Sequence, residues 1–457
     1  MKNNLNYSNV YFLGIGGIGM SALARYFLSK NIAVAGYDKT ETALTGSLKN
    51  EGAIIQYNDN VAEIPKEFKE TSKTLVIYTP AIPSDLSLLI FYQKSKAKIL
   101  KRSEVLGEIT RTEKGLCVAG THGKTTTASL LTHIIYESEI KCNAFLGGIS
   151  TNLNSNVLVN DNAQYSIIEA DEFDRSFLKL SPFSSIITSC DPDHLDIYKD
   201  KESFKDGFKQ YSMKSDLQGY SIQKEGLNLP SLSSILTYAI NSKTADYSVD
   251  EISYVNGKMK AKFRMKNRIW SNMEFGLPGI HNAENALACA ALLLNIGFTE
   301  EDIRFGIRTF QGVKRRFEYH INSEELVYID DYAHHPTEIE HVLNSILEIY
   351  PERNIYLIFQ PHLFSRTKDF SDDFAIQLSR VHELILMPIY PARELPMHGI
   401  NSEWLLQKIK CKNKYVKKPS EVVSHFKNIK KGIVLTLGAG DIDRIVIPLK
   451  EILESNL

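Results

Sequence analysis

The glycine-rich segment Gly120-Thr-His-Gly-Lys-Thr-Thr126 constrains the fold more than any other feature of the sequence. It lies between an apolar run typical of a buried strand, Leu116–Ala119, and a helical pattern over Thr126–Ile135. This order of strand, glycine turn and helix predicts an α/β fold with a parallel sheet. Backbone N–H groups at such a turn, together with the helix N-terminus, form a cavity suited to phosphate oxygens.

Two side chains of this segment suit a bound nucleoside triphosphate. Lys124 can reach the terminal phosphates, and the Thr125 hydroxyl can face a bound Mg²⁺. A glycine turn with a surface lysine is the alternative, but the strand, turn, helix and hydroxyl follow in the order that a phosphate loop requires. We therefore expect the whole segment to bind ATP: Gly120, Thr121, His122, Gly123, Lys124, Thr125 and Thr126.

Acidic residues follow the next two predicted strands, Tyr165–Ile168 and Ser185–Thr188. Ligands bind at the carboxyl ends of parallel strands, so Glu169 or Asp171 is expected to hold Mg²⁺ against the phosphates. A solvated acidic loop is the alternative. His194 lies among carboxylates after the second strand. Magnesium prefers oxygen, so His194 would be an unusual ligand, better suited to a second and less strictly hard metal site.

A second glycine-rich loop lies near the start of the chain. Gly14, Gly16 and Gly19 follow the predicted strand Val10–Leu13 and precede a predicted helix, and Asp38 ends the next strand. Alone, this pattern is a dinucleotide fingerprint and favours an NAD-dependent oxidoreductase. The same geometry serves any diphosphate, because backbone donors bind the phosphates rather than the base.

Strand and helix patterns alternate along the chain in three stretches. They predict three α/β domains, at residues 1–112, 113–312 and 313–457. The polar stretch Thr110–Gly115 is predicted to be a linker between the first two. Ile252–Val255 and Met259–Met265, separated by Asn-Gly, predict a β-hairpin that adds antiparallel strands to the central sheet.

The charge balance gives no bulk electrostatic reason to expect nucleic acid or an anionic membrane as a partner. There are 53 Lys+Arg against 54 Asp+Glu, a formal net charge of -1. No stretch is long and apolar enough to span a bilayer, and the first residues lack the apolar run of a signal peptide. The five cysteines form no CxxC pair. A cytoplasmic protein is expected.

The glycine-rich segment Gly120–Thr126 and the acidic and histidine segments, together with three further stretches, resemble the Mur ligase family, the ATP-dependent enzymes that build the peptide of bacterial cell-wall precursors. The stretches are Leu277-Pro-Gly-Ile-His-Asn-Ala-Glu-Asn-Ala286, Lys314-Arg-Arg-Phe-Glu318 and Asp330-Asp-Tyr-Ala-His-His-Pro-Thr-Glu338. The resemblance implies that Asn282 and Asn285 bind the adenine side of ATP and that Arg316 reaches its γ-phosphate. Asp331 is expected to bind ATP as well.

The same resemblance implies the remaining site residues. Catalytic roles fall to Lys124, Arg316 and His194, and metal binding to Thr125, Glu169 and His194. The substrate residues implied are Gly14, Gly16, Gly17, Gly19, Asp38, Tyr332, His334, His335, His362 and Arg366. Ile280 and Leu363 stand where arginine is common, and Lys209 falls near the place of a lysine that is carboxylated in sister enzymes.

Within the family, Gly14-Ile-Gly-Gly-Ile-Gly-Met-Ser21 and Phe359-Gln-Pro-His-Leu-Phe-Ser-Arg-Thr367 are similar to the alanine-adding branch. The resemblance implies a Rossmann-like UDP-binding domain, a central phosphate-loop ATPase domain and a Rossmann-like C-terminal domain. It implies ligation of L-alanine to the lactyl carboxylate of UDP-N-acetylmuramate through an acyl phosphate, by a monomer or weak homodimer. The alternatives are a recycling ligase that adds a tripeptide to the same sugar, the oxidoreductase, and a catalytically silent binding protein. The general base stays open among His335, His334 and Asp331.

Overall fold

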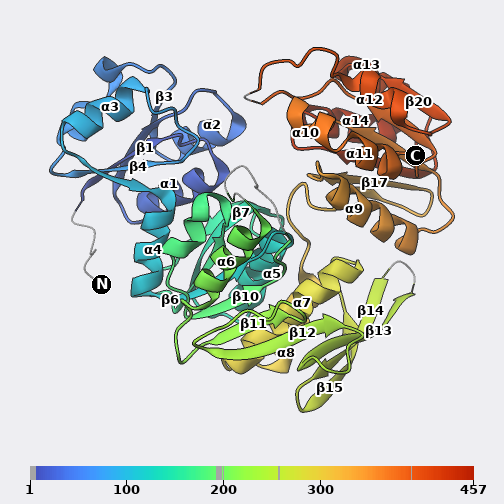
Figure 1. The fold of residues 1–457 in the computed structure, drawn as a ribbon, viewed down its shortest axis with the longest axis horizontal. Coiled ribbons are helices and arrows are strands. Elements are labelled where there is room, and N and C mark those ends of the chain that lie inside the picture. Colours follow the sequence, from blue (N-terminus) through green and yellow to red (C-terminus); the bar gives the residue numbers. More distant parts are fainter. Residues whose placement is uncertain (1–6, 192–197, 199, 256–257, 393) are drawn as a thin grey trace. The chain divides into compact units, whose positions relative to one another are not determined.

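The computed structural model describes residues 7–191, 198, 200–255, 258–392 and 394–457. The chain forms two compact units, Met1–Gln311 and Gly312–Leu457. Two sheets belong to the first unit and one to the second (Figure 1). The predicted α/β class with parallel sheets is confirmed.

The first sheet has five parallel strands in the order β3-β2-β1-β4-β5. Its elements are β1 (Asn9–Leu13), α1 (Ile18–Ser29), β2 (Ala33–Tyr37), α2 (Ala43–Asn50), β3 (Ile54–Gln56), η1 (Val61–Glu63), η2 (Lys66–Lys69), β4 (Thr74–Tyr78), α3 (Ser87–Lys94) and β5 (Lys98–Lys101). The strand order reverses between β1 and β4, so the loop after β1 lies at a switch point, where doubly wound sheets bind ligands.

The second sheet has ten strands in the order β15-β14-β13-β12-β11-β10-β6-β9-β7-β8. Its elements are α4 (Arg102–Thr112), β6 (Lys114–Ala119), α5 (Lys124–Glu137), β7 (Cys142–Ser150), β8 (Ser155–Leu158), β9 (Tyr165–Ala170), η3 (Phe173–Lys179), β10 (Ser184–Ile187), α6 (Lys201–Ser212), β11 (Tyr220–Lys224), β12 (Ser234–Ile240), β13 (Tyr247–Val255), β14 (Lys258–Met265), β15 (Arg268–Glu274), α7 (Ile280–Asn295) and α8 (Glu300–Thr309). The predicted hairpin is confirmed, because β14 pairs antiparallel with both β13 and β15.

The predicted linker at Thr110–Gly115 is wrong. Helix α4 runs to Thr112 and β6 begins at Lys114, so Glu113 alone separates them. Polar side chains of this stretch form hydrogen bonds with other parts of the unit. The Thr110 hydroxyl accepts from the Ser181 N–H at 3.0 Å, and Glu113 accepts from Asn143. Polar composition here reflects those bonds.

One hydrophobic core runs through both sheets of the first unit. It joins Val10 and Phe12 of β1 to Cys117 of β6 and Phe208 of α6, with Ile109 of α4 in the same cluster. Helix α4 leads from the first sheet to the second (Figure 1). The two sheets of this unit therefore share apolar contacts as well as the chain.

The second unit is a six-stranded sheet in the order β16-β17-β21-β18-β19-β20, with only β16 antiparallel. Its elements are β16 (Glu318–Asn322), β17 (Leu326–Asp331), α9 (Pro336–Ile349), β18 (Ile355–Phe359), α10 (Phe364–Asp369), α11 (Ser371–Leu378), β19 (Glu383–Leu386), α12 (Ser402–Lys408), β20 (Asn413–Val416), α13 (Pro419–His425), β21 (Gly432–Leu437) and α14 (Asp443–Ser455). The unit has two hydrophobic cores. Residues of α9, α11 and α12 contribute to one, and residues of α13 and α14 contribute to the other. Across the described residues, every helix is too short or too polar to cross a bilayer.

Candidate active site

The glycine-rich segment leaves the carboxyl end of β6, whose neighbours in the sheet are β9 and β10. Both neighbours run parallel to β6. The segments that follow the three strands therefore emerge at one edge of the sheet. The acidic residues after β9 and the polar residues after β10 meet the phosphate loop there, as the strand-end argument predicts.

Two glycines shape the phosphate loop. Gly120 has φ +135°, and a Cβ on it would collide with the Thr188 hydroxyl and lie 2.8 Å from the Ser189 backbone nitrogen. Gly123 has φ +79° and is the N-cap of α5, so the first N–H groups of this helix open toward the loop. The turn thus needs glycine at both positions, and it directs backbone donors to one point.

Lys124 is held by a carboxylate that the sequence did not single out. Its Nζ donates to both carboxylate oxygens of Glu172, at 2.9 and 2.8 Å, and to the Gly120 carbonyl at 2.5 Å. Glu172 is 1% exposed. Burial raises the pKa of Glu172, and the positive charge of Lys124 works against that rise. Glu172 belongs to the acidic run read from the sequence, but nothing in the run distinguished its direction from that of Asp171.

The Thr125 hydroxyl donates to Glu169 Oε2 at 3.0 Å, and the Gly147 N–H donates to Glu169 Oε1 at 2.5 Å. Asp171 instead contacts Arg102, with 3.4 Å between its Oδ2 and the arginine Nη2. Of the two carboxylates that the sequence left open for a metal, Glu169 is therefore the one beside the phosphate loop. A hydroxyl and a carboxylate together are oxygen ligands of the kind Mg²⁺ prefers.

Residues after β10 fix the other side of the loop. The Thr121 hydroxyl donates to the Asp191 carbonyl at 2.7 Å, and the His122 N–H donates to the Ser189 hydroxyl at 2.9 Å. His122 Nε2 lies 4.0 Å from a carboxylate oxygen of Asp191. His194, predicted as a catalytic and metal residue, lies outside the described residues.

The two predicted adenine-side asparagines lie at the start of α7. The Asn285 amide oxygen is 3.1 Å from the point where a Cβ on Gly123 would lie, so Asn285 borders the phosphate loop. Asn282 Nδ2 donates to the Pro278 carbonyl at 2.8 Å. Asn282 also lines a small cavity with Thr126 of α5, and the cavity's other walls are largely apolar. Ile280 is the first residue of α7.

The N-terminal glycine loop is hydrogen-bonded to the end of β2 and to Asp38, which follows it. Gly14 has φ +87° and donates to the Tyr37 carbonyl at 2.8 Å, and the Gly16 N–H donates to Asp38 Oδ2 at 2.7 Å. Gly17 is the N-cap of α1. The loop thus presents a helix N-terminus at the switch point of the first sheet, an arrangement suited to a diphosphate.

In the second unit, the guanidinium carbons of Arg316 and Arg315 lie 5.2 and 5.3 Å from the centroid of the Tyr332 ring. Asp331 accepts from the N–H groups of Phe317 at 2.6 Å and Ala333 at 2.7 Å, so it holds the turn that carries both arginines. Burial is the main cause that raises the pKa of Asp331 to about 6, with Arg316 opposing the rise.

Three of the predicted substrate residues gather beside Tyr332. His334 Nδ1 lies 3.0 Å from the Tyr332 carbonyl, its ring centroid is 5.7 Å from that of His362, and Arg366 Nη1 lies 3.4 Å from His362 Nδ1. Burial lowers the pKa of His334, and burial followed by the charges of His334 and Arg366 lowers that of His362 to about 4. Both histidines are therefore neutral near pH 7.

His335 has a different position from these three. It is the N-cap of α9, accepting from the Thr337 N–H at 3.4 Å, and its ring meets Phe370 edge-on with 4.7 Å between centroids.

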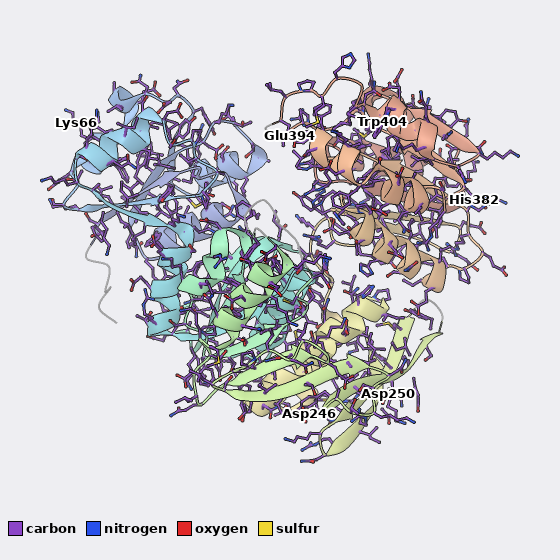
Figure 2. All side chains as sticks on the ribbon, viewed as in Figure 1. Lys66, Asp246, Asp250, His382, Glu394 and Trp404 are labelled. Atoms are coloured by element: carbon purple, nitrogen blue, oxygen red, sulfur yellow. The ribbon has the colours of Figure 1, made fainter. Side chains whose placement is uncertain are left out.

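The helix that carries Arg366, α10, is anchored by Glu394, which accepts from the Ser365 N–H at 3.0 Å; Glu394 is labelled in Figure 2. Leu363 precedes α10 with φ +71°.

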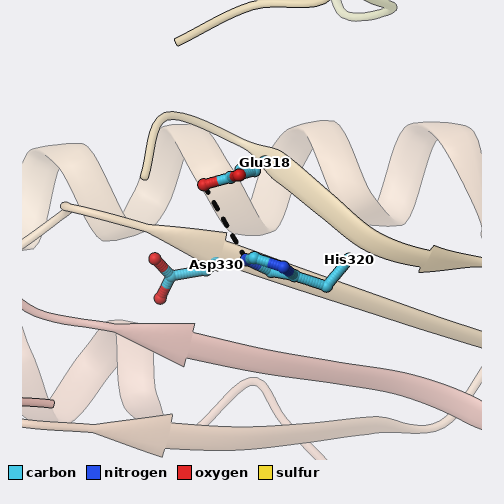
Figure 3. A group of neighbouring side chains, drawn as sticks. All are labelled: Glu318, His320 and Asp330. Atoms are coloured by element: carbon cyan, nitrogen blue, oxygen red, sulfur yellow. Dashed lines mark ion pairs between the residues drawn. The ribbon is translucent and has the colours of Figure 1, made fainter. Parts of the chain in front are cut away.

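A further group of possible metal ligands lies on β16 and β17. Figure 3 shows Glu318, His320 and Asp330 as neighbouring side chains. Their possible ligand atoms all lie within 4.8 Å of one another. Arg315 already forms hydrogen bonds with both carboxylates of this group. Its Nε donates to Asp330 at 3.1 Å, and its backbone N–H donates to Glu318 at 2.7 Å. The other Asp330 oxygen accepts from the Thr436 hydroxyl at 2.6 Å. Because the carboxylates are neutralised and hydrogen-bonded, we assign no metal to them.

Family models match nearly the whole chain. They are the Mur ligase family catalytic domain at residues 9–114, the Mur ligase middle domain at 118–293, and the Mur ligase glutamate ligase domain at 315–446.

Individual relatives agree with these models. A UDP-N-acetylmuramate–L-alanine ligase of Porphyromonas gingivalis is 45% identical over 98% of this chain and 99% of its own length. One of Cytophaga hutchinsonii is 44% identical over 99% and 98%. The crystal structure of the UDP-N-acetylmuramate–alanine ligase of Thermotoga maritima superposes with a TM-score of 0.84 at 26% identity, covering 98% of this chain and 100% of that one. A murein peptide ligase of Psychrobacter arcticus, at 20% identity and a TM-score of 0.68, shares the fold over 97% and 98%.

Proposed function

The chain belongs to the Mur ligase family, and we propose that it joins L-alanine to the lactyl carboxylate of UDP-N-acetylmuramate, converting ATP to ADP and phosphate. The observation that carries the proposal is 45% identity over 98% of the chain to a ligase with this activity. The meeting of Lys124, Thr125 and Glu169 at the end of β6 supports it, because this arrangement suits a nucleoside triphosphate.

The chemistry proceeds in two transfers. A carboxylate oxygen of the sugar attacks the γ-phosphorus of ATP, and the bond from the γ-phosphorus to the bridging oxygen of ADP breaks. The alanine nitrogen then attacks the carbonyl carbon of the acyl phosphate; an amide forms, and inorganic phosphate leaves. The amine proton passes to a base. Lys124 offsets charge on the transferring phosphoryl group, and Arg316 is the second positive charge that the family resemblance assigns to it.

Thr125 and Glu169 are the residues that would hold Mg²⁺, because both present oxygen and lie 3.0 Å apart. When bound, the ion neutralises phosphate charge. The residues of the chain do the rest: the Gly120–Lys124 backbone orients the phosphates, and Asn285 packs against that turn. Among the candidate bases His335, His334 and Asp331, burial lowers the pKa of His334, so this histidine is neutral near pH 7 and able to accept a proton.

The test is phosphate release with saturating UDP-N-acetylmuramate and Mg²⁺·ATP, measured against a panel of amines. L-Alanine should give the highest kcat/KM. Glycine should be used about tenfold less well, because a missing methyl is worth only about 1 kcal/mol in an apolar pocket. Faster turnover with L-Ala-D-Glu-meso-diaminopimelate would assign the chain to the recycling reaction instead, and NAD reduction without phosphate release would reject the ligase altogether.

A further inference from the structure

One short loop touches both phosphate-binding regions of the first unit. It follows β9 and comprises Asp171, Glu172 and the first residues of η3, up to Arg175. Asp171 pairs with Arg102, Glu172 pairs with Lys124, and Asp174 accepts from Lys101 Nζ at 2.6 Å. The three acidic residues of the loop thus each pair with a different cation.

Arg102 connects this loop to the N-terminal glycine loop. It is the first residue of α4, and its guanidinium lies against the first turn of α1: a Cβ on Gly19 would be 2.9 Å from Arg102 Cζ and would collide with Nη1. A positive side chain is unfavourable at the N-terminus of a helix unless an anion is near. Asp171 is that anion in this structure, at 3.4 Å.

Lys124 connects the same loop to the ATP phosphate loop. Both oxygens of Glu172 are engaged by the lysine, and Glu172 is buried. A phosphate ligand that recruits Lys124 must compete with Glu172, since the lysine has three donors and one already goes to the Gly120 carbonyl. After Phe173, Asp174 and Arg175 have φ +53° each, a left-handed conformation unusual for residues with side chains.

We propose that Arg102 and the Asp171–Glu172 loop couple the two phosphate sites, so that a diphosphate at the glycine loop strengthens ATP binding at the phosphate loop and the reverse. Arg102 exchanges Asp171 for the diphosphate, and Lys124 exchanges Glu172 for the ATP phosphates. Each ligand removes one of the ion pairs that hold the loop. The second ligand then competes with a loop that is already loosened, which is a positive and reciprocal coupling.

The inference rests on the proposed function in taking the glycine loop as the site of the UDP-sugar diphosphate and the phosphate loop as the site of ATP. Arg102 acts here as a ligand-binding and positioning residue. The coupling should be of the usual size for two sites in one protein, about five- to tenfold in affinity.

Calorimetry measures the coupling directly. The dissociation constant of Mg²⁺·AMP-PNP is determined with and without saturating UDP-N-acetylmuramate, and no alanine is added. In the wild type, the sugar nucleotide should lower this constant about five- to tenfold. Asp171→Asn keeps the acceptor that bonds the Phe173 N–H but weakens the pair with Arg102. AMP-PNP alone should then bind this variant nearly as tightly as it binds the sugar-loaded wild type, and the coupling should fall below about twofold.

Two further variants separate coupling from general loosening of the loop. Asp174→Asn is the matched control, because it removes an ion pair of the same loop, to Lys101, without touching Arg102; it should keep the wild-type coupling. Arg102→Gln should lose the coupling and also weaken UDP-sugar binding, whereas Asp171→Asn should leave that binding as tight or tighter. A protein that merely lost loop structure would bind the sugar more weakly in both variants.

The proposal is overturned if the wild type shows no coupling, if Asp171→Asn retains it, or if Asp174→Asn loses it equally. A wild type that binds AMP-PNP but no UDP-N-acetylmuramate overturns the proposed function itself, and this inference with it.

Discussion

Lys124 forms an ion pair with the buried carboxylate of Glu172. Glu172 is 1% exposed, and Lys124 donates to both of its carboxylate oxygens. Breaking a buried ion pair by removing one partner commonly costs about 3–5 kcal/mol, because the other charge stays buried without compensation. A change at Lys124 therefore acts on stability and on catalysis at once, and the two effects have to be separated.

Lys124→Ala should lower phosphate release about 1,000-fold and also destabilise the protein by several kcal/mol. The double variant Lys124→Ala/Glu172→Gln should recover most of the stability, since a neutral amide replaces the uncompensated carboxylate, while its activity stays lost. Urea unfolding and phosphate release on the same preparations check both statements. Recovery of activity in the double variant would show that Lys124 only neutralises Glu172.

Asp331 should make stability depend on pH in an identifiable way. Burial raises its folded-state pKa to about 6 from 3.8, so the folded protein holds this proton more tightly than the unfolded chain does. The contribution of Asp331 to the free energy of unfolding is greatest below pH 4. It falls as the pH rises through 6, by about 3 kcal/mol in total. Asp331→Asn removes the titrating group.

The measurement for Asp331 is the urea midpoint of wild type and Asp331→Asn between pH 4 and 7. The wild-type curve minus the variant curve should fall with pH in that window, because contributions common to both proteins cancel. A difference that rises with pH would mean that the hydrogen bonds from Phe317 and Ala333 hold the pKa below its usual value.

At the scale of elements, the meeting of the glycine-rich loop with the segments after β9 and β10 was predictable, because strand ends in a parallel sheet meet at one edge. The sequence predicted strands before Gly120, Glu169 and the Asp191 segment, and β6, β9 and β10 are neighbours as that requires. Which way each carboxylate points was not predictable. Glu172 and Asp171 are adjacent in the sequence, yet one meets Lys124 and the other Arg102.

The contact between the phosphate loop and the segment after β10 can be tested at Gly120. A Cβ there would collide with the Thr188 hydroxyl, and φ is +135°, so Gly120→Ala must displace the loop. AMP-PNP binding should weaken at least about tenfold, because the backbone donors lose their common direction. Gly46→Ala is the matched control, because Gly46 lies in α2 and a Cβ added there would have no neighbouring atom within 4 Å. This variant should stabilise the protein by about 0.5–1 kcal/mol and leave AMP-PNP binding unchanged. Unchanged AMP-PNP affinity in Gly120→Ala would contradict the assignment of this loop to the phosphates.

At the scale of the whole molecule, alternating strand and helix patterns predicted three α/β domains, and the structure has three sheets. These patterns did not predict that the two sheets of the first unit share one hydrophobic core. The stretch Thr110–Gly115 is polar and suggested a linker, but α4 and β6 nearly abut there. Hydrophobic periodicity identifies the apolar face of each element and carries no information on which distant element covers it. The continuity of the first unit's core is for that reason a finding of the structure alone.

This difference in core organisation predicts how fragments of the chain behave. The cores of the second unit contain only its own residues, from Phe317 to Leu453, so residues 312–457 should fold alone and unfold cooperatively on heating. Cutting at 112/113 should fail, because the core that joins Val10 and Ile109 to Cys117 would be divided. Residues 1–112 should then expose apolar surface and aggregate, whereas residues 1–311 stay monomeric and bind AMP-PNP. Circular dichroism melting and size-exclusion chromatography of the three fragments decide the matter. A stable, monomeric 1–112 fragment would mean that each sheet of the first unit has a sufficient core of its own, and that the shared cluster adds little to the stability of either.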